Sequence, residues 1–338
     1  MSTPSGDGGH IPVMLAEVLA ALEPRDGERY IDATFGAGGY TKAILGAAET
    51  HVLAIDRDPD AIAEGQALVA ASGGRLMLLK GVFGDMASLA TGSGFAAVDG
   101  IVLDIGVSSM QLDRAERGFS FMSDGPLDMR MSQEGRSAAD IVNEDDERDI
   151  AFILRTWGEE RQAGRIARAI TREREKAPIA TTRQLAAIVE RVLGRSWDER
   201  KHPATRTFQA LRIAVNNELD ELTQGLEAAE RLLKPGGRLV LVTFHSEEDR
   251  IAKRFLTERT GRTAGVSRHG PPMTGEAPSQ SFRFVNHRPL TPGEEEIARN
   301  PRSRSAKLRT ALRTEAAPFP ASRERDRAQP PGPDRRRR

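Results

Sequence analysis

The 338-residue sequence contains no cysteine. This absence excludes structural disulfides, thiolate-bound metals and iron–sulfur clusters. It also excludes catalysis by a cysteine nucleophile. A chain of this length that lacks covalent or metal staples must be held by its hydrophobic core, and it is long enough to form two compact units. We therefore expect a protein of ordinary globular domains with no bound metal.

Long hydrophobic runs and an excess of one charge are also lacking. No apolar stretch approaches the roughly 20 residues that cross a bilayer. Polar residues crowd the first positions, and no signal-peptide core follows them. We expect a soluble, cytoplasmic protein with no membrane contact. Lysine plus arginine equal aspartate plus glutamate at 49 each, so the net charge gives no argument for nucleic acid.

The basic residues are nevertheless unevenly distributed, with an excess from Arg299 onward. A tail rich in proline and arginine covers residues 315–338 and ends in Arg335 to Arg338. This composition predicts disorder. Its arginines either bind RNA electrostatically or belong to a solvated extension with no specific role.

Residues 30–56 have the pattern of a nucleotide-binding βαβ half-unit. An apolar run around Ile31 leads to a turn that contains Gly36, Gly38 and Gly39, and a second apolar run ends in Asp56. Glycines in such a turn let the backbone approach a ligand, and an acid after the second strand typically binds ribose hydroxyls. Glycines that only turn the chain are the alternative, which the spacing to Asp56 disfavours.

The same segment indicates which cofactor is bound. A dinucleotide fold has a third glycine three positions after Gly38, where this chain has Thr41. Asp32 would place a carboxylate close to a pyrophosphate, but it suits the amino group of a methionine moiety. The pattern therefore favours S-adenosylmethionine over a nicotinamide dinucleotide.

Further apolar runs extend the pattern to an α/β sheet that is covered on both faces. They lie at residues 76–79, 101–103, 239–244 and near 306–312. Short, continuous runs of this kind are typical of parallel strands. The stretch between residues 103 and 239 is too long for one crossover and is mostly helical in pattern. We expect a sheet domain of residues 1–112 and 209–314, interrupted by a helical substrate-recognition domain of residues 113–208.

Within the insertion, helical spacing covers residues 145–157, 159–176 and 182–192, after a polar loop at 113–134. Thr181 is a candidate N-cap, Pro178 a break and Gly194 a stop. One further helix is expected over residues 206–233. A Lys-Pro-Gly-Gly turn at 234–237 would then lead the chain back into the sheet.

Several residues with useful chemistry follow strands at one sheet edge. Asp104 ends the 101–103 strand and is our candidate for accepting a proton from an exocyclic base amine, with a turn cap as the alternative. Phe83 either flanks an adenine or belongs to the core. His245 and Ser246 follow the 239–244 strand, and for Ser246 we favour a helix cap over substrate contact.

Nine long motifs lie in order along the chain, at residues 10–15, 30–39, 54–59, 103–113, 116–122, 125–131, 202–212, 243–250 and 300–305. Together they resemble the RsmH (MraW) family of bacterial 16S ribosomal RNA cytosine-N4 methyltransferases. The resemblance covers nearly the whole chain and ends at about Thr314. It implies a class I (Rossmann-like) methyltransferase sheet with an inserted helical domain. It also implies S-adenosylmethionine-dependent methylation of N4 of a cytidine in the decoding region of 16S ribosomal RNA.

The resemblance also implies the site residues and the partner. Cofactor contacts fall on Gly38, Gly39, Tyr40, Asp56, Phe83, Asp104 and Gln111. The family usually has histidine at the position of Tyr40, so a backbone contact is expected there. The partner is 16S ribosomal RNA in the small ribosomal subunit, with the choice between naked RNA and assembled subunit open. The oligomeric state is open too, a homodimer included.

Contacts to the RNA are less specific in the sequence. An unpaired or flipped base needs an aromatic platform, for which the candidates are Phe119, Phe121, Trp157 and Phe244. RNA-contacting arginines are Arg114, Arg117, Arg130, Arg206 and Arg212, each with a solvated or salt-bridged role as the alternative. Rival functions are an NAD-dependent dehydrogenase and a noncatalytic RNA-binding protein. Methylation at C5 of a pyrimidine is disfavoured because it requires a cysteine.

Overall fold

The computed structural model describes residues 12–194, 202–261 and 279–320. The motif that begins at His10 and the terminal arginines therefore lie wholly or partly outside the described residues. No helix in these described ranges has both the length and the apolar composition needed to cross a membrane.

A seven-stranded sheet forms the larger unit, in the order β3-β2-β1-β4-β5-β7-β6. Its strands are β1 Arg29–Asp32, β2 His51–Asp56, β3 Leu76–Lys80, β4 Val98–Asp104, β5 Leu233–Thr243, β6 Phe282–Phe284 and β7 Lys307–Arg313. The first five are parallel, and β7 runs antiparallel to both β5 and β6. The chain order reverses between β1 and β4, where open α/β sheets bind ligands. The class I methyltransferase sheet expected from the sequence is confirmed.

Both faces of the sheet are buried because alternate residues of each strand enter different cores. Ile31, Leu53 and Leu103 belong to one hydrophobic cluster, whereas Tyr30 and Val52 belong to another. The first face is covered by α4 Met86–Gly92, α11 Glu218–Leu232 and α12 Ser246–Arg259, and the second by α1 Leu15–Leu22, α2 Gly39–Ala47 and α3 Pro59–Ala71. This is the reason that the strands read as continuous apolar runs.

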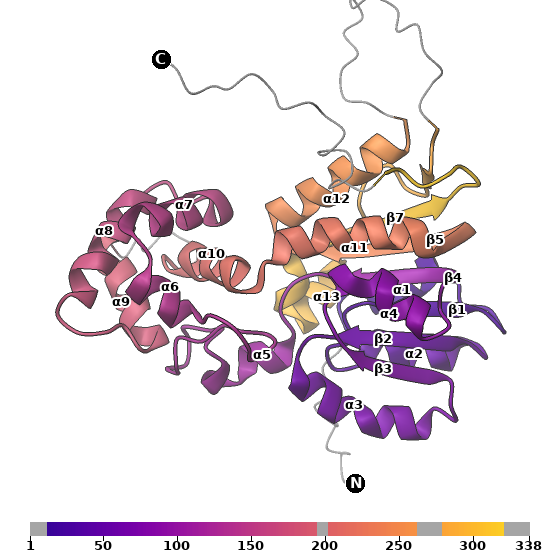
Figure 1. The fold of residues 1–338 in the computed structure, drawn as a ribbon, viewed down its shortest axis with the longest axis horizontal. Helices are drawn as coiled ribbons and strands as arrows, with labels where there is room; N and C mark the ends of the chain where they lie inside the picture. Colours follow the sequence, from indigo (N-terminus) through magenta and orange to yellow (C-terminus); the bar gives the residue numbers. More distant parts are fainter. Residues whose placement is uncertain (1–11, 195–201, 262–278, 321–338) are drawn as a thin grey trace, which may run out of the picture.

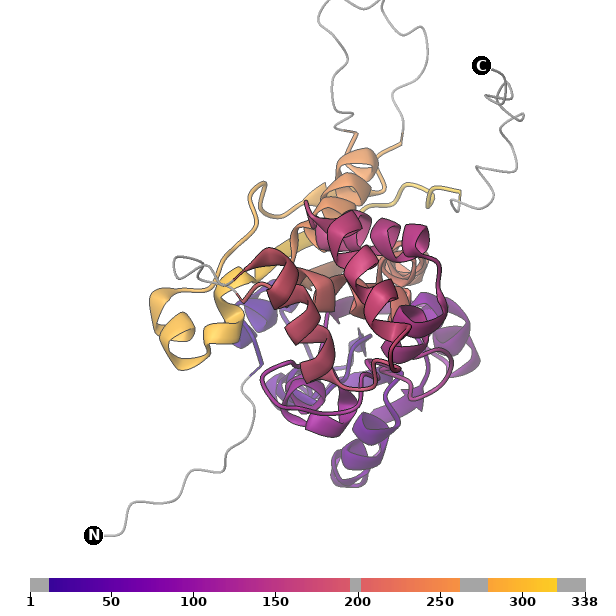
Figure 2. The same cartoon turned by 90° about the vertical axis from the view of Figure 1, so that its left-hand side faces the viewer.

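The helical unit lies beside the carboxyl ends of the parallel strands (Figures 1 and 2). It contains α6 Ala138–Glu144, α7 Glu147–Gly158, α8 Ala163–Arg174, α9 Thr182–Leu193 and α10 Thr205–Asn216, which share a hydrophobic core of their own. Thr181 caps α9 by accepting a hydrogen bond from the Gln184 amide, and Gly194 ends it, as expected. The short helix α6 was not predicted.

The predicted single helix over residues 206–233 is wrong. Asn217, with φ of 52°, separates α10 from α11. Phe208 of α10 packs in the helical unit, whereas Leu222 of α11 packs against the sheet. The apolar spacing continues across the break because both helices bury one face, and asparagine tolerates the left-handed conformation at the break. The predicted domain boundary at residue 209 lies inside α10.

The connecting segments carry short helices that shape the sheet edge. These are α5 Ser109–Asp113, α13 Glu294–Arg299 and the 3₁₀ turns Phe83–Asp85, Ala115–Arg117 and Pro301–Ser305. The polar loop predicted at 113–134 is irregular apart from the second of these turns. The Lys-Pro-Gly-Gly segment lies within β5, where the pairing with β4 shifts register between Val98 and Gly100.

Candidate active site

A cavity of about 350 Å³ opens at the carboxyl ends of β1, β2 and β4. Of the residues predicted to contact the cofactor, those that line it are Gly39, Tyr40, Asp56, Phe83, Asp104 and Gln111. Gly38 is not among the lining residues. Its φ of 75° and the Phe35 ring, 2.7 Å from where a Cβ would lie, give it a role in shaping the turn.

Asp56 braces the glycine turn from the end of β2. Its Oδ2 accepts a hydrogen bond from the Gly36 amide at 2.7 Å, and its Oδ1 accepts one from the Asp58 amide at 2.8 Å. Burial raises the pKa of the Asp56 carboxyl, and the two amides oppose that rise. Each carboxylate oxygen retains acceptor capacity. Asp56 therefore holds the turn and still presents an acceptor to the cavity.

Asp32 lies beneath the turn, not in the cavity. It is fully buried and absent from the cavity lining, and its Oδ2 accepts a hydrogen bond from Thr41 Oγ1 at 2.7 Å. The described residues therefore do not place Asp32 in the cavity lining, and its expected role beside a methionine amino group stays a prediction. Thr41, at the position where a dinucleotide fold has glycine, supplies a hydroxyl to a buried carboxylate.

Burial raises the pKa of Asp32 to about 6, and the hydrogen bonds from Thr41 and Thr34 oppose the rise. The folded protein then binds more protons than the unfolded chain between pH 4 and 6, so the stability due to Asp32 falls as pH rises through that window. An Asp32→Asn variant does not titrate there. We expect its free energy of unfolding, relative to the native protein, to rise by about 2 kcal/mol from pH 4 to pH 7. Urea unfolding at pH 4, 5 and 7 measures this, and a pH-independent difference would contradict it.

The side chains of Tyr40 and Gln111 are both held within the protein. The Tyr40 hydroxyl donates to the Val13 carbonyl, which fits a cofactor contact through the Tyr40 backbone. Gln111 Oε1 accepts from the Ser108 amide at 3.1 Å in a capping box of α5. Its Nε2 donates to Asp58 Oδ2 at 2.8 Å.

Arg117 completes this network, which the sequence reading did not find. It is buried and donates to the same Asp58 Oδ2 at 2.8 Å. Its other bonds go to Asp60 and to the carbonyls of Arg130 and Met131. The network ties the loop after α5 to the start of α3. The only part of this network that the sequence indicates is Asp58, because an Asp-Pro pair is typical of a helix N-terminus.

Asp104 ends β4 beside the cavity. Its amide donates to Thr34 Oγ1 at 2.7 Å, and its Oδ1 is buried without a hydrogen-bond partner among the described residues. Burial raises the pKa of Asp104 well above its usual value, and the nearby carboxylates of Asp32 and Glu248 add to the rise. An unpaired buried acceptor is costly unless a ligand satisfies it. A positive charge or an N–H donor in the cavity would stabilise its ionised form.

Phe244 lines the same cavity as Asp104, just beyond the neighbouring strand. Asp104 pairs with Val242 of β5, and Phe244 follows that strand by one residue, lining the cavity. A Cβ on Gly106 would lie 3.7 Å from the Phe244 ring, so Gly106 leaves room beside it. Phe244 thus offers an aromatic surface in the same cavity as Asp104.

The other proposed aromatic platforms lie outside the cavity lining. Phe119 is buried in the helical unit. Phe121 stacks on His202 with ring centroids 4.4 Å apart, and Trp157 makes an edge contact with Phe152 at 6.2 Å. The structure therefore selects Phe244 among the candidate platforms.

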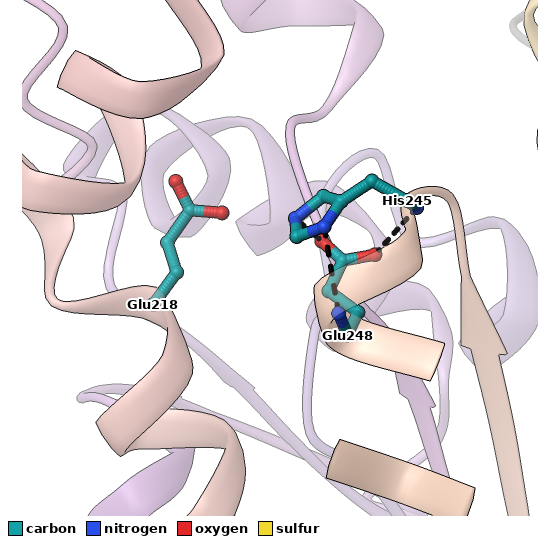
Figure 3. Close-up of side chains that lie close together, drawn as sticks. All are labelled: Glu218, His245 and Glu248. Atoms are coloured by element: carbon teal, nitrogen blue, oxygen red, sulfur yellow. Dashed lines mark hydrogen bonds and ion pairs between the residues drawn. The ribbon is translucent and has the colours of Figure 1, made fainter. Parts of the chain in front are cut away.

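Figure 3 shows a polar cluster of Glu218, His245 and Glu248, of which the two glutamates are buried. His245 follows the cavity-lining Phe244 in the chain. The prediction that Ser246 caps α12 is wrong, because His245 is the N-cap and its Nδ1 accepts from the Glu248 amide. Glu248 Oε2 in turn accepts from the amides of Phe244 and His245. Ser246 instead donates to Glu159 Oε1 at 2.9 Å.

The cluster has the ligand types of a divalent-cation site, with one atom from each residue within 4.8 Å of the others. Its positive charge comes from Arg212, however. The guanidinium binds both oxygens of Glu218, at 2.7 and 2.8 Å, and lies 3.8 Å from Glu248 Oε1. His245 Nε2 is itself 2.7 Å from that Oε1. The arrangement therefore fits an ion-pair network that joins α10, α11 and α12.

Most arginines proposed for RNA contact are already paired. Arg114 binds Asp60 and Glu64, Arg130 binds Asp128, and Arg117 and Arg212 are described above. Arg206 is exposed and donates to the Glu159 carbonyl, at 3.4 Å. Arg302 was not proposed, yet it lines the cavity and pairs with Asp113 at 2.6 Å.

Comparisons with known proteins bear on the chemistry of this cavity. The family model described as the MraW methylase family matches residues 7–314. The chain is 58% identical over 311 residues to "Ribosomal RNA small subunit methyltransferase H" of Parvibaculum lavamentivorans, covering 92% of this chain and 91% of that protein. It is 58% identical over 315 residues to the protein of the same name from Azorhizobium caulinodans, covering 93% and 90%.

A crystal structure of a putative rRNA-methylase from Clostridium thermocellum is similar at 13% identity and a TM-score of 0.42 over 90% of this chain and all of that one. That likeness is too low to support an argument, so the sequence relatives decide the family. A methylase family confirms S-adenosylmethionine, rather than a nicotinamide dinucleotide, as the cofactor. On a family match over most of its length and relatives at 58% identity, the chain belongs to the MraW methylase family.

Proposed function

We propose that this protein methylates N4 of a cytidine in the decoding region of 16S ribosomal RNA. Support for the RNA comes from the relatives, whose name is ribosomal RNA small subunit methyltransferase H. Support for an exocyclic amine as the acceptor comes from Asp104 beside the cavity, whose buried Oδ1 has no hydrogen-bond partner in the part of the chain that the structure describes. That unpaired oxygen is the observation that carries the proposal.

An amine on a base ring is a poor nucleophile because its lone pair is delocalised into the ring. A carboxylate that accepts a hydrogen bond from the amine localises the lone pair, and it can then accept the proton that N4 loses as the N–C bond forms. When bound, S-adenosylmethionine supplies an activated methyl group. The remaining task of the protein is to hold N4 in line with that group in a site that excludes water.

The residues around the cavity divide these tasks in our proposal. Asp56 and the Gly39 backbone hold the ribose and methionine ends of the cofactor, and Phe83 flanks its adenine. Phe83 also packs over Gly225, where a Cβ would lie 2.6 Å from its ring, so its position is fixed by α11. Phe244 stacks on the cytosine ring and directs N4 toward Asp104.

We expect Asp56→Ala to weaken binding of S-adenosylhomocysteine by about 10- to 100-fold, since hydrogen bonds to a charged acceptor contribute about 1.5–3 kcal/mol. The fold should persist because Asp56 lies at the edge of the core. Titration calorimetry measures the affinity. Glu64→Ala, an exposed carboxyl of α3 that is absent from the cavity lining, is the matched control. Equal affinity of Asp56→Ala and the native protein would remove Asp56 from the cofactor site.

The test of the proposed function is mass spectrometry of nucleosides from small-subunit ribosomal RNA after incubation with the protein and labelled S-adenosylmethionine. Naked RNA and purified small subunits serve as separate substrates. Label in N4-methylcytidine supports the proposal. Label in another nucleoside would show that the acceptor atom is not N4 of a cytidine. No label in either substrate would favour a noncatalytic RNA-binding protein.

A further inference from the structure

The helical unit carries a basic groove between α8 and α9, which shares no lining residue with the cavity. We call it the α8–α9 groove. It is lined by Arg165, Arg168, Ala169, Arg172, Glu173, Lys176, Ile188, Arg191 and Val192. Glu173 is the one acidic side chain among these lining residues. The groove is therefore strongly positive, although the chain as a whole has no net charge.

The groove is basic because of the way α8 is patterned. Ile166, Ala167 and Ile170 form its buried face. Arg165, Arg168 and Arg172 follow at spacings of three and four, which align them in one stripe on the outer side of the helix. The stripe continues to Lys176 just past the end of the helix, and Arg191 of α9 faces it across the groove.

These cations are only weakly neutralised within the protein. Glu173 is shared between Arg191 at 3.0 Å and Lys176 at 3.5 Å, and Arg168 lies 3.5 Å from Glu147. The basic side chains of these pairs are more than 60% exposed. Exposed ion pairs contribute at most about 1 kcal/mol, so an external anion can replace the carboxylates. Arg172 has no ion-pair partner in the described part of the chain.

The chemistry of the groove fits a polyanion backbone rather than a base. Its lining holds guanidinium and ammonium groups with small aliphatic side chains between them, and no aromatic ring. Arginine forks bind phosphate oxygens bidentately, and rows of basic groups follow a phosphodiester chain. Base reading would require aromatic platforms or buried polar groups.

The position of the groove decides which part of an RNA it meets. In Figure 1, α8 and α9 form the end of the molecule opposite the sheet, and Figure 2 shows the helical unit from that side. An RNA whose target base enters the cavity must extend along the helical unit to reach the groove. We propose that the α8–α9 groove binds the phosphate backbone of the RNA substrate at a distance from the methylated nucleotide. This inference rests on the proposed RNA substrate.

A double charge reversal, Arg168→Glu with Arg172→Glu, tests the inference. Both sites are exposed, so the variant should fold, and circular dichroism checks this. With small-subunit ribosomal RNA or small subunits as substrate, we expect KM to rise at least about tenfold with kcat and S-adenosylhomocysteine affinity unchanged. The slope of log affinity against log salt should fall by roughly 0.7–0.9 for each lost phosphate contact.

The matched control is Arg148→Glu with Arg155→Glu, the same change of charge on exposed positions of α7 outside the groove. An unchanged KM and salt slope in the groove variant would overturn the inference, as would an equal effect of the control pair. RNA binding is also measured by filter retention. If the native protein binds this RNA but does not methylate it, the proposed function fails, while the difference in binding still decides the role of the groove.

Discussion

Replacing Asp104 with asparagine is expected to lower kcat for RNA methylation by about 10²–10⁴-fold, the usual contribution of a positioned general base. The amide keeps nearly the shape of the carboxyl and an oxygen acceptor, but it cannot take up the proton from N4. Cofactor affinity should fall much less than kcat, because the lost interaction forms with the acceptor amine in the transition state.

Single-turnover rates and titration calorimetry on the same preparation separate these two effects. The pH profile gives a second readout. Burial raises the pKa of Asp104, so the native rate should increase with pH as the carboxyl ionises, and Asp104→Asn should lose that dependence. Glu49→Gln, an exposed carboxyl between α2 and β2, is the control for a change of charge. Equal losses of kcat and cofactor affinity would leave Asp104 a cofactor ligand only.

The carboxylates at the sheet edge were predictable because strand ends can be read from a single sequence. Asp56 and Asp104 each close an apolar run, and parallel strands place such ends at one edge. Strand ends alone did not predict that Asp32, which also ends a strand, is fully buried and absent from the cavity lining. Its hydrogen bond from Thr41 of α2 is a tertiary contact, which a strand pattern does not report.

The break at Asn217 shows a second limit of sequence reading. Apolar spacing indicates that a helix has a buried face, but it does not indicate which hydrophobic core that face packs into. Phe208 and Leu222 fit one continuous helical pattern while belonging to different cores. The only signal of the break in the sequence is Asn217 itself, because asparagine tolerates a positive φ. The strand β6 was missed since three residues carry no usable period.

The His245 cap was missed for a related reason. Sequence rules give serine the preference at an N-cap, and Ser246 precedes a run of acids. The structure instead uses His245, because Glu248 reaches back to the amides of Phe244 and His245. This capping box fixes the backbone of Phe244 at the cavity. Because His245 rather than Ser246 caps α12, the cap also positions Phe244, the candidate platform for the target base.

Arg117→Ala is expected to destabilise the protein by about 3–5 kcal/mol, the usual cost of removing one partner from a buried ion pair. Arg117 is 7% exposed and its partner Asp58 is 1% exposed, so the variant leaves a buried carboxylate without its cation. The two carbonyls that Arg117 binds, of Arg130 and Met131, also lose their donors. Urea unfolding monitored by circular dichroism measures the loss.

Arg114→Ala is the matched control, because Arg114 binds Asp60 and Glu64 from the same loop but its side chain is 35% exposed. Such a pair contributes at most about 1 kcal/mol. Losses of equal size in the two variants would show that the buried network adds nothing beyond a surface ion pair.

A larger loss of stability in Arg117→Ala should also affect the candidate site. Asp58 also accepts a hydrogen bond from the Gln111 side-chain amide at 2.8 Å. Without Arg117, Asp58 should hold Gln111, and with it helix α5 at the border of the cavity, less firmly. Cofactor affinity should therefore fall in Arg117→Ala but not in Arg114→Ala.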